Sequence, residues 1–320
     1  MRWRRSLVMS KSNLNLPTVA FDVKSDIEDG YSGYFIVAFV DLLGTDAKNA
    51  EIKAQPEFPS EMLEREVGKV KAFQRNFYRM LDTLVESAAR LNTQRPESEN
   101  IAIEKLRGND VISYAFSDSI IFHASLNDKL GREVPVSSCL TIMAALVYVQ
   151  LWSLSCGHPF RGGVEIGRAA VFNGNQILGP ALSDAVKLEK QAQFPRIIIG
   201  EEVRKYLQLF SQLPPDAPAK HANRSYAELC RSLICESDEP SELYKIDADK
   251  GDKKSIFSLD IHSDFVVSLF RDKQQHEELV TKARNFADGQ VQRFASQEGN
   301  DEKLVCHYRH LLDYLNDRAE

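Results

Sequence analysis

The sequence predicts an α+β protein in which helices pack on one sheet of the ferredoxin-like, split βαβ type. Two patterns support this prediction. Apolar residues recur at helical spacing in several long segments, and short runs rich in β-branched and aromatic residues are bounded by turn residues. The expected order is strand, helix, hairpin, helix, strand, helix, strand, which is the order of that sheet with additions.

The first half of the predicted sheet comes from residues 35–124. "FIVAFVDLLGT", residues 35–45, reads as a buried strand that ends at Asp41. In residues 61–91 apolar positions recur every three or four residues, which indicates one face of a long helix. "VISYAFSDSIIFHA", residues 111–124, reads as two short strands around Ser117 and Asp118, so we expect a β-hairpin there.

The second half continues with an apolar segment at 136–156, which we expect to be a buried helix. "FRGGVEIGRAAVF", residues 160–172, is predicted to be a strand whose glycines permit close backbone approach. Pro180 suits the first turn of a helix, "PALSDAVKLEKQAQ", and "RIIIG" follows as a further strand.

The remaining chain is predicted with less regular signals. We expect a tail at residues 1–30, a main domain at 31–262 with a surface insertion at about 211–240, and a C-terminal helical extension at 263–320. Within these segments, "ELYKID" and "SIFSLDI" read as two more strands, and the extension reads as a helical hairpin broken at "SQEGND".

Composition narrows the class of protein. The chain has 320 residues, 43% of them hydrophobic, and a formal charge of −6, which argues against a general nucleic-acid-binding surface. Its five cysteines are an odd, scattered set, which suits a reducing cytoplasm. We find no apolar segment that approaches the roughly 20 residues needed to cross a bilayer. The sequence therefore predicts a cytoplasmic protein without a membrane span.

Two aspartates are the first candidates for chemistry. The first strand of a split βαβ sheet lies beside the hairpin, so Asp41 and Asp118 can converge. Paired carboxylates repel unless a cation or proton separates them, and Mg²⁺ or Mn²⁺ commonly binds carboxylates together with substrate phosphates. Gly44 would open the turn's amides to phosphate oxygens. Alternatively, Asp41 caps the next helix and Asp118 only makes the turn.

The order of the motifs resembles the catalytic domain of class III nucleotidyl cyclases over about residues 35–200. "FVDLLGT" is similar to that family's first strand, "YAFSDSIIF" to its metal-binding hairpin, and "RGGVEIG" to its next strand. "RGGVEIG" followed by "ILGPALSDAVKLE" resembles more narrowly the pyrimidine cyclases of Pycsar anti-phage systems.

The resemblance implies a mechanism with two Mn²⁺ or Mg²⁺ ions held by Asp41, the Leu42 carbonyl and Asp118. One ion would activate the ribose 3′-hydroxyl for attack on the α-phosphate, and the other would balance charge on the departing pyrophosphate. Amides around Leu43, Gly44 and Thr45 would hold the β- and γ-phosphates.

The resemblance also points to residues that choose the base. Tyr114 and Gln176 fall where adenylate cyclases usually have lysine and aspartate and guanylate cyclases glutamate and cysteine. A tyrosine and a glutamine suit the smaller edge of a pyrimidine. Phe39, on the same strand face as Asp41, is a candidate to line the base pocket, with ordinary core packing as the alternative.

The family's transition-state asparagine and arginine correspond here to Ser183 and Lys187, which share one helix face. A lysine neutralises phosphate charge but does not make the two-pronged contact of an arginine. The alternative is that Lys187 and Lys190 lie on a solvated face. Family homodimers build each site from both subunits, so the resemblance implies a twofold homodimer with composite sites.

These features lead to a functional prediction with alternatives. The first is a uridylate cyclase that makes cyclic UMP from UTP as an alarm signal for a separate effector in anti-phage defence. A cytidylate cyclase acting on CTP is the first alternative, and a catalytically degenerate nucleotide-sensing dimer is the second. An ordinary purine cyclase is disfavoured by Tyr114 and Gln176.

Overall fold

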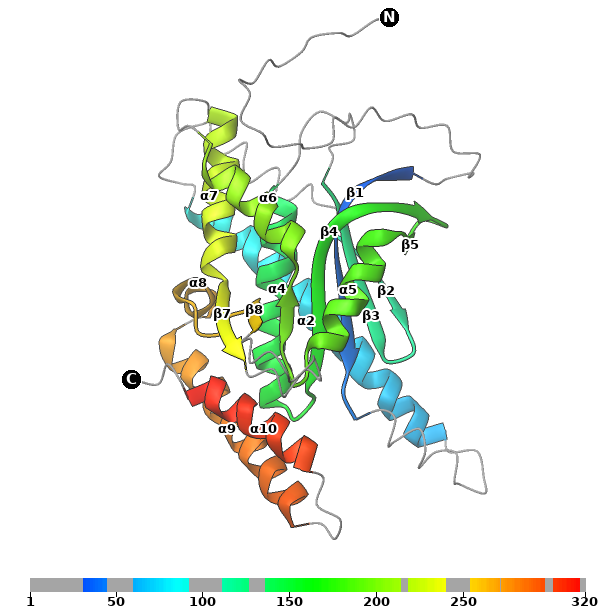
Figure 1. Cartoon of the computed structure of the whole chain (residues 1–320), viewed down its shortest axis with the longest axis vertical. Helices are drawn as coiled ribbons and strands as arrows, with labels where there is room; N and C mark the ends of the chain where they lie inside the picture. The colour runs from blue at the N-terminus through cyan, green and yellow to red at the C-terminus, as the bar shows by residue number, and fades with distance from the viewer. Residues whose placement is uncertain are drawn as a thin grey trace, which may run out of the picture.

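The computed structural model describes residues 31–44, 60–91, 111–126, 136–213, 218–239, 254–270, 272–296 and 302–316. Over these ranges the chain is a mixed α+β structure, in which helices surround one twisted sheet (Figure 1). The predicted class is confirmed. The predicted elements follow one another as expected, with one short unpredicted strand, β5 (Gln176–Leu178), between the strand at 160–172 and the helix that begins at Pro180.

The sheet is built around a central strand, β1, which covers Tyr31–Leu42. In the described residues the strand order is β2-β3-β1-β4-β6-β8-β7, and β5 pairs with β4. The first four positions are the split βαβ arrangement, because antiparallel β3 and β4 flank β1 on its two sides. The other strands are β2 Ile112–Phe116, β3 Ser119–Ser125, β4 Phe160–Phe172, β5 Gln176–Leu178, β6 Ile197–Ile199, β7 Ile234–Glu239 and β8 Lys254–Leu259.

The two faces of β1 belong to different cores. Ile36, Ala38 and Val40 face the main core, to which helices α2 (Ser60–Leu91) and α4 (Val136–Ser155) contribute. The alternate residues Phe35 and Val37 face a smaller cluster under helix α5, Pro180–Gln191. This alternation follows from the two-residue period of a strand, and it places Asp41 on the α5 face.

Helix α4 corrects one expectation from the sequence. It is 20 residues long and apolar enough to pass a length-and-composition test for a membrane span, although we expected no segment of that length. Nearly all of its side chains are buried inside the fold, where it contacts α2, α7 and α9. Such burial is typical of the central helix of a protein core.

The segment expected to be a surface insertion is partly core. Helix α6 (Glu201–Ser211) is followed by α7 (Pro218–Ser232), which packs against α4 and α6. Ala227 and Cys230 of α7 and the following Leu233 are fully buried in the main core. The abundance of polar residues in α7 reflects one solvated face of an amphipathic helix rather than a loop.

The C-terminal part is the predicted helical hairpin, formed by α9 (Lys273–Ala295) and α10 (Glu302–Asn316) after a short α8 (Asp264–Ser268). It joins the main core, because α9 packs on α4 and Tyr314 of α10 accepts a hydrogen bond from the Ile261 amide (2.9 Å). The strand predicted at "SIFSLDI" is β8, whereas "ELYKID" lies outside the described residues.

Helix α5 lies directly on β4 because β4 carries glycines where the two backbones meet. A Cβ atom at Gly163 would stand 2.3 Å from the Ala185 carbonyl oxygen and 2.5 Å from the Cβ of Leu188. Gly179, at the start of α5, has φ 143°, and a Cβ atom added there would stand 2.8 Å from the Ala169 Cα. These contacts fix the position of α5 over the sheet.

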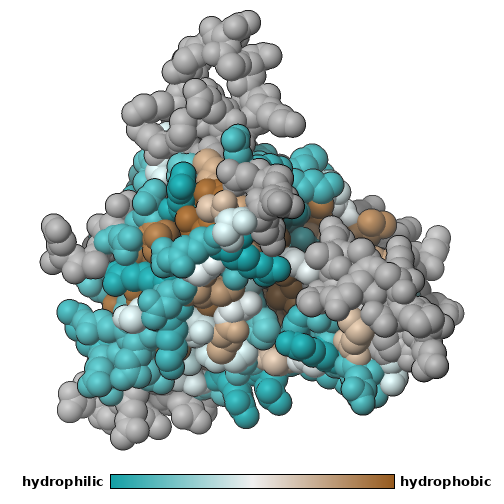
Figure 2. All heavy atoms as spheres, turned by 90° about the horizontal axis from the view of Figure 1, so that it is seen from below, coloured by the Kyte–Doolittle hydropathy of each residue, from teal (hydrophilic) through white to brown (hydrophobic). Residues whose placement is uncertain are grey.

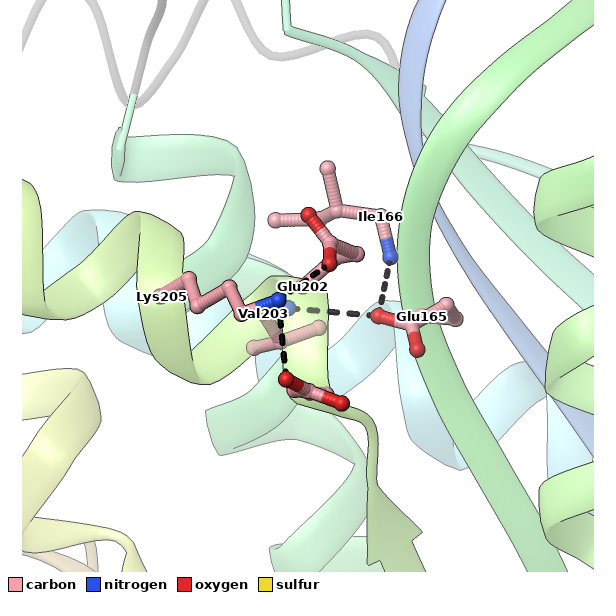
Figure 3. Close-up of polar contacts among 6 residues, drawn as sticks. Glu165, Ile166, Glu202, Val203 and Lys205 are labelled. Atoms are coloured by element: carbon pink, nitrogen blue, oxygen red, sulfur yellow. Dashed lines mark hydrogen bonds and ion pairs between the residues drawn. The ribbon is translucent and has the colours of Figure 1, made fainter. Parts of the chain in front are cut away.

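A buried carboxylate joins β4 to the start of α6 (Figure 3). One oxygen of Glu165 accepts hydrogen bonds from the amides of Ile166 (2.9 Å) and Val203 (3.2 Å). Glu165 thereby satisfies an amide at the N-terminus of α6, where Gly200 offers no capping side chain. A Cβ at Gly200 would collide with this carboxylate, so the two residues fit each other.

Candidate active site

Asp41 lies at the end of β1, with β3 and β4 on its two sides. Its cross-strand partners are Ser119 and Arg161. The Ser119 hydroxyl donates a hydrogen bond to Asp41 Oδ1 (3.0 Å), and a terminal guanidinium nitrogen of Arg161 lies 3.8 Å from Oδ2. The carboxylate is therefore oriented by its neighbours while 24% of the side chain stays exposed.

Asp118 occupies the turn between β2 and β3, where Ser117 adopts a positive φ of 57°. The Leu42 amide donates a hydrogen bond to the Asp118 carbonyl oxygen (3.2 Å). This bond brings the turn beside the end of β1, so the two aspartates predicted to converge lie on adjacent strand ends. Figure 2 views the molecule from this end, where small hydrophobic groups lie among mainly hydrophilic side chains.

The turn after Asp41 limits which amides are available for phosphate. The Leu43 amide donates to the Pro159 carbonyl (2.9 Å), so in this conformation it is already used inside the protein. Gly44 is exposed and has φ 87°, a backbone conformation that favours glycine. Thr45 lies outside the described residues. Phosphate contacts from this turn would therefore come from Gly44 onward rather than from Leu43.

A row of apolar side chains crosses the sheet two residues away from Asp41. Phe39 pairs with Ile121, and Ile121 pairs with Tyr114. All three belong to the cluster on the α5 face, and Phe39 and Tyr114 are only partly buried. The structure thus brings the predicted base-pocket residues Phe39 and Tyr114 onto one face with Asp41.

Gln176 begins β5 and is followed by Ile177, which packs in the cluster on the α5 face, so strand alternation directs the Gln176 side chain to the other face. The His123 ring on β3 contacts the carbonyl oxygen of Asn175 (Nε2 to O, 3.0 Å). Burial lowers the pKa of this fully buried histidine, so a neutral ring that donates from Nε2 fits the contact. His123 stands two residues along β3 from Ile121, the partner of Tyr114. This contact holds the turn between β4 and β5, which precedes Gln176, near the predicted base pocket.

Ser183 and Lys187 do not approach Asp41 within the single chain. Both are exposed on the face of α5 that points away from the sheet, whereas Ala181 and Ala185 face it. The Lys187 ammonium pairs with Asp184 one turn earlier (2.7 Å). A site that used both Asp41 and Lys187 would need a second copy of the chain.

Arg161 and Glu189 are site residues that the sequence reasoning missed. Arg161 Nε forms an ion pair with Glu189 of α5 at the place where Arg161 also approaches Asp41. Burial raises the pKa of Glu189, an effect that the Arg161 charge opposes and the Asp41 charge reinforces. The available signal was the position of Arg161 at the start of "RGGVEIG", which in an antiparallel pairing can stand opposite Asp41.

Basic residues also gather on the opposite side of the end of β1. A cavity of about 340 Å³ lies between β1, α2 and the end of α4. Arg65, Lys69 and His158 line it together with Leu42 and Leu43. Burial and the charges of Lys69 and Arg65 lower the pKa of His158, although Glu66 opposes them. These basic side chains therefore lie close to the end of β1 that carries Asp41.

The donors near Asp41 fit a hard divalent cation. The described residues contain no group of three or more histidine, cysteine, aspartate and glutamate side chains that could hold a metal by themselves. Asp41 and Asp118 supply two carboxylates at adjoining strand ends, and Mg²⁺ or Mn²⁺ normally completes such a set with water and substrate phosphate oxygens. The two carboxylates could therefore hold a divalent metal, whose other positions water or a substrate phosphate would fill.

Comparisons with known proteins identify no family by sequence: no family model and no curated protein matches the chain. Solved structures that resemble it include the adenylyl cyclase CyaB from P. aeruginosa, with 12% identity and a TM-score of 0.34 over 72% of this chain and 96% of that chain. The catalytic core of a rhodopsin-guanylyl cyclase with converted specificity, in complex with ATPαS, has 9% identity and a TM-score of 0.36 over 72% and 98%.

A bacterial light-regulated adenylyl cyclase has 11% identity and a TM-score of 0.35, and the match covers 80% of this chain and 59% of that chain. TM-scores and identities this low assign neither a fold nor an activity to the chain. The split βαβ fold rests instead on the order and pairing of the strands in the sheet.

Proposed function

We propose that this chain is a pyrimidine nucleotide cyclase that converts UTP to cyclic UMP and pyrophosphate. The observation that carries this proposal is the shared location of Asp41, Asp118, Phe39 and Tyr114 at one end of the sheet. The end of the sheet would then offer two carboxylates for a metal–triphosphate complex. Two residues further along the strands, it would offer an aromatic pocket for the base.

The proposed reaction is an intramolecular phosphoryl transfer. The ribose 3′-oxygen bonds to the α-phosphorus, the bond from that phosphorus to the oxygen bridging to the β-phosphate breaks, and the hydroxyl proton leaves to solvent. When bound, divalent metal favours the ionised 3′-oxygen and offsets charge on pyrophosphate. Asp41 and Asp118 bind and orient the complex, and Ser119 fixes the rotamer of Asp41 through its hydrogen bond.

The base contacts support a pyrimidine over a purine. Tyr114 is a partly buried side chain at the position where the purine cyclases usually carry a lysine or a glutamate, and its bulkier ring leaves less space for the base. Gln176 can both donate to and accept from a base edge, so it suits either uracil or cytosine. The preference for UTP rests on the resemblance of "RGGVEIG" and "ILGPALSDAVKLE" to pyrimidine cyclases.

The site is proposed to be completed by a homodimer. Ser183 and Lys187 are exposed on the outer face of α5, so a twofold partner would bring them to the phosphates over Asp41. The same resemblance supports a role in anti-phage defence in the cytoplasm, where cyclic UMP would act on a separate effector. CTP is the alternative substrate.

A second candidate function has its own support. Lys187 replaces the arginine expected at a transition-state position and is ion-paired with Asp184, which favours a chain that binds a nucleotide without turning it over. In this alternative the fold would be a nucleotide-sensing dimer.

The test is to incubate the purified chain with each of the four ribonucleoside triphosphates and Mn²⁺ and to separate the products. We expect cyclic UMP and pyrophosphate, with cyclic CMP as a lesser product. Asp41→Ala and Asp118→Ala should each lower turnover by about a hundredfold or more, since each removes a metal ligand. Asp288→Ala, on the exposed face of α9, is the matched control and should keep full turnover.

Absence of any cyclic product, with tight nucleotide binding retained, would instead support the sensing dimer. Near-normal turnover in either aspartate variant would contradict the proposed metal site.

A further inference from the structure

The guanidinium of Arg161 lies between two carboxylates of unequal exposure. Its Nε is ion-paired with Glu189, whose side chain is only 4% exposed. Its terminal nitrogen stands 3.8 Å from Asp41, whose side chain is 24% exposed. Arg161 thus holds the buried carboxylate closely and the exposed one loosely.

The backbone fixes all three charges. Arg161 is directly opposite Asp41 in the β1–β4 ladder. Glu189 is fixed on the other side of Arg161 because α5 packs against Gly163 of β4. A Cβ atom added at Gly163 would lie 2.8 Å from the backbone nitrogen of Glu189. These constraints leave the Arg161 side chain as the part that can move between the two acids.

One guanidinium fully balances one carboxylate. A buried carboxylate without a partner is costly, so the pair with Glu189 is the one that folding favours. Asp41, at the exposed end of β1, is therefore the carboxylate that Arg161 holds at the longer distance of 3.8 Å. If Glu189 carried no charge, Arg161 would be free to close on Asp41 and compete with a cation there.

We infer that Glu189 is a positioning residue that restrains Arg161 and so keeps Asp41 available to a divalent cation. The inference rests on the proposed metal site at Asp41. It makes the metal affinity of the strand end depend on a side chain of α5 that would not touch the metal.

The experiment is a double-mutant cycle on Mn²⁺ binding by the full chain. Free Mn²⁺ is followed by electron paramagnetic resonance without nucleotide, for the wild type, Glu189→Gln, Arg161→Gln and the double variant. We expect Glu189→Gln to weaken Mn²⁺ binding about three- to tenfold when Arg161 is present, as a neighbouring charge does at a partly exposed site. In the Arg161→Gln background, Glu189→Gln should change the Mn²⁺ affinity less than about twofold.

Two controls separate this effect from general charge. Glu202→Gln removes an exposed, ion-paired carboxylate of α6 and should leave Mn²⁺ affinity unchanged. A crystal structure of metal-free Glu189→Gln should show Arg161 closed on Asp41 within hydrogen-bonding distance, a result that stands even if the Arg161→Gln variant does not fold.

Equal effects of Glu189→Gln in the two backgrounds would overturn the inference, as would an Arg161 that stays apart from Asp41 in the variant crystal. Failure of the proposed function would give a different result. The wild type and Asp41→Ala would then bind Mn²⁺ equally, because no ion would be held by Asp41. That result would remove the metal site and this inference together.

Discussion

At the residue scale, the choice of base is proposed to depend on Tyr114, whose side chain lies on the α5 face of β2. Its neighbour Ser113 points the other way, toward Gln74 and Tyr78 of α2. Strand β2 therefore directs Tyr114 to the proposed pocket and Ser113 to the side covered by α2. This alternation allows base selection and packing to be tested separately.

We predict that Tyr114→Lys changes the preference among the four triphosphates. A smaller contact surface and a positive charge should raise the relative kcat/KM for purines about tenfold or more, because polar contacts to a base discriminate strongly. The measurement is product formation in competition assays. Tyr78→Lys places the same charge on the opposite side of β2 and should leave the preference unchanged. An unaltered preference in Tyr114→Lys would show that the pocket lies elsewhere.

Glu165 offers a second test at this scale, because burial is the main cause that raises its pKa, and hydrogen bonds from Ile166 and Val203 only partly offset it. A raised folded-state pKa means that the acid contributes stability at low pH and loses that contribution as pH rises through the folded value. The free energy of unfolding of Glu165→Gln minus that of the wild type should therefore increase with pH between about 4 and 7.

Urea unfolding of both proteins across that range measures the difference. Glu201→Gln is the control of opposite sign, because a hydrogen bond from Lys205 lowers the pKa of exposed Glu201. Parallel pH curves for the wild type and Glu165→Gln would contradict the proposed burial effect.

At the element scale, the contact of α5 with β4 decides how the site is assembled. Gly163 lets the helix backbone lie on the strand, and this contact sets Glu189 beside Arg161. The other face of α5 carries Ser183 and Lys187 into solvent. One short helix thus links the strand proposed to bind metal with residues proposed to serve a second subunit.

We predict that Gly163→Ala lowers the free energy of unfolding by about 1–3 kcal/mol, because its Cβ would overlap backbone atoms of α5. Gly289→Ala is a matched substitution in the exposed interior of α9, where no atom lies within 4 Å of the added Cβ. It should raise the free energy of unfolding by about 1 kcal/mol. Denaturant titration measures both, and a neutral Gly163→Ala would show that α5 packs less closely.

At the scale of the whole molecule, the proposed composite site can be tested by complementation. Mixed Asp118→Ala and Lys187→Ala chains should recover about a quarter of wild-type activity, since half of randomly formed dimers would hold one intact site of two. Mixing Asp41→Ala with Asp118→Ala should recover none, because both residues lie at the same strand ends of one chain. No recovery in the first mixture, with heterodimers confirmed by mass, would contradict shared sites.

The sequence by itself determined the order of the first predicted elements and the place of a carboxylate, Asp41, one residue before the end of β1. Those features depend on local periodicity and turn residues, which can be read directly from the sequence. For example, the strand predicted at 160–172 has the observed bounds of β4. It also indicated that Asp41 and Asp118 converge, because strand order in a split βαβ sheet follows from the order of its elements.

Only the tertiary structure decided the long-range contacts. The turn between β4 and β5 meets β3 through the contact between His123 and Asn175, 52 residues apart in the chain. The Arg161–Glu189 pair forms only because α5 packs on β4 at Gly163. Helix α7 belongs to the core because its apolar side packs against α4. Such contacts arise from packing of distant segments, whose partners and distances no local pattern encodes.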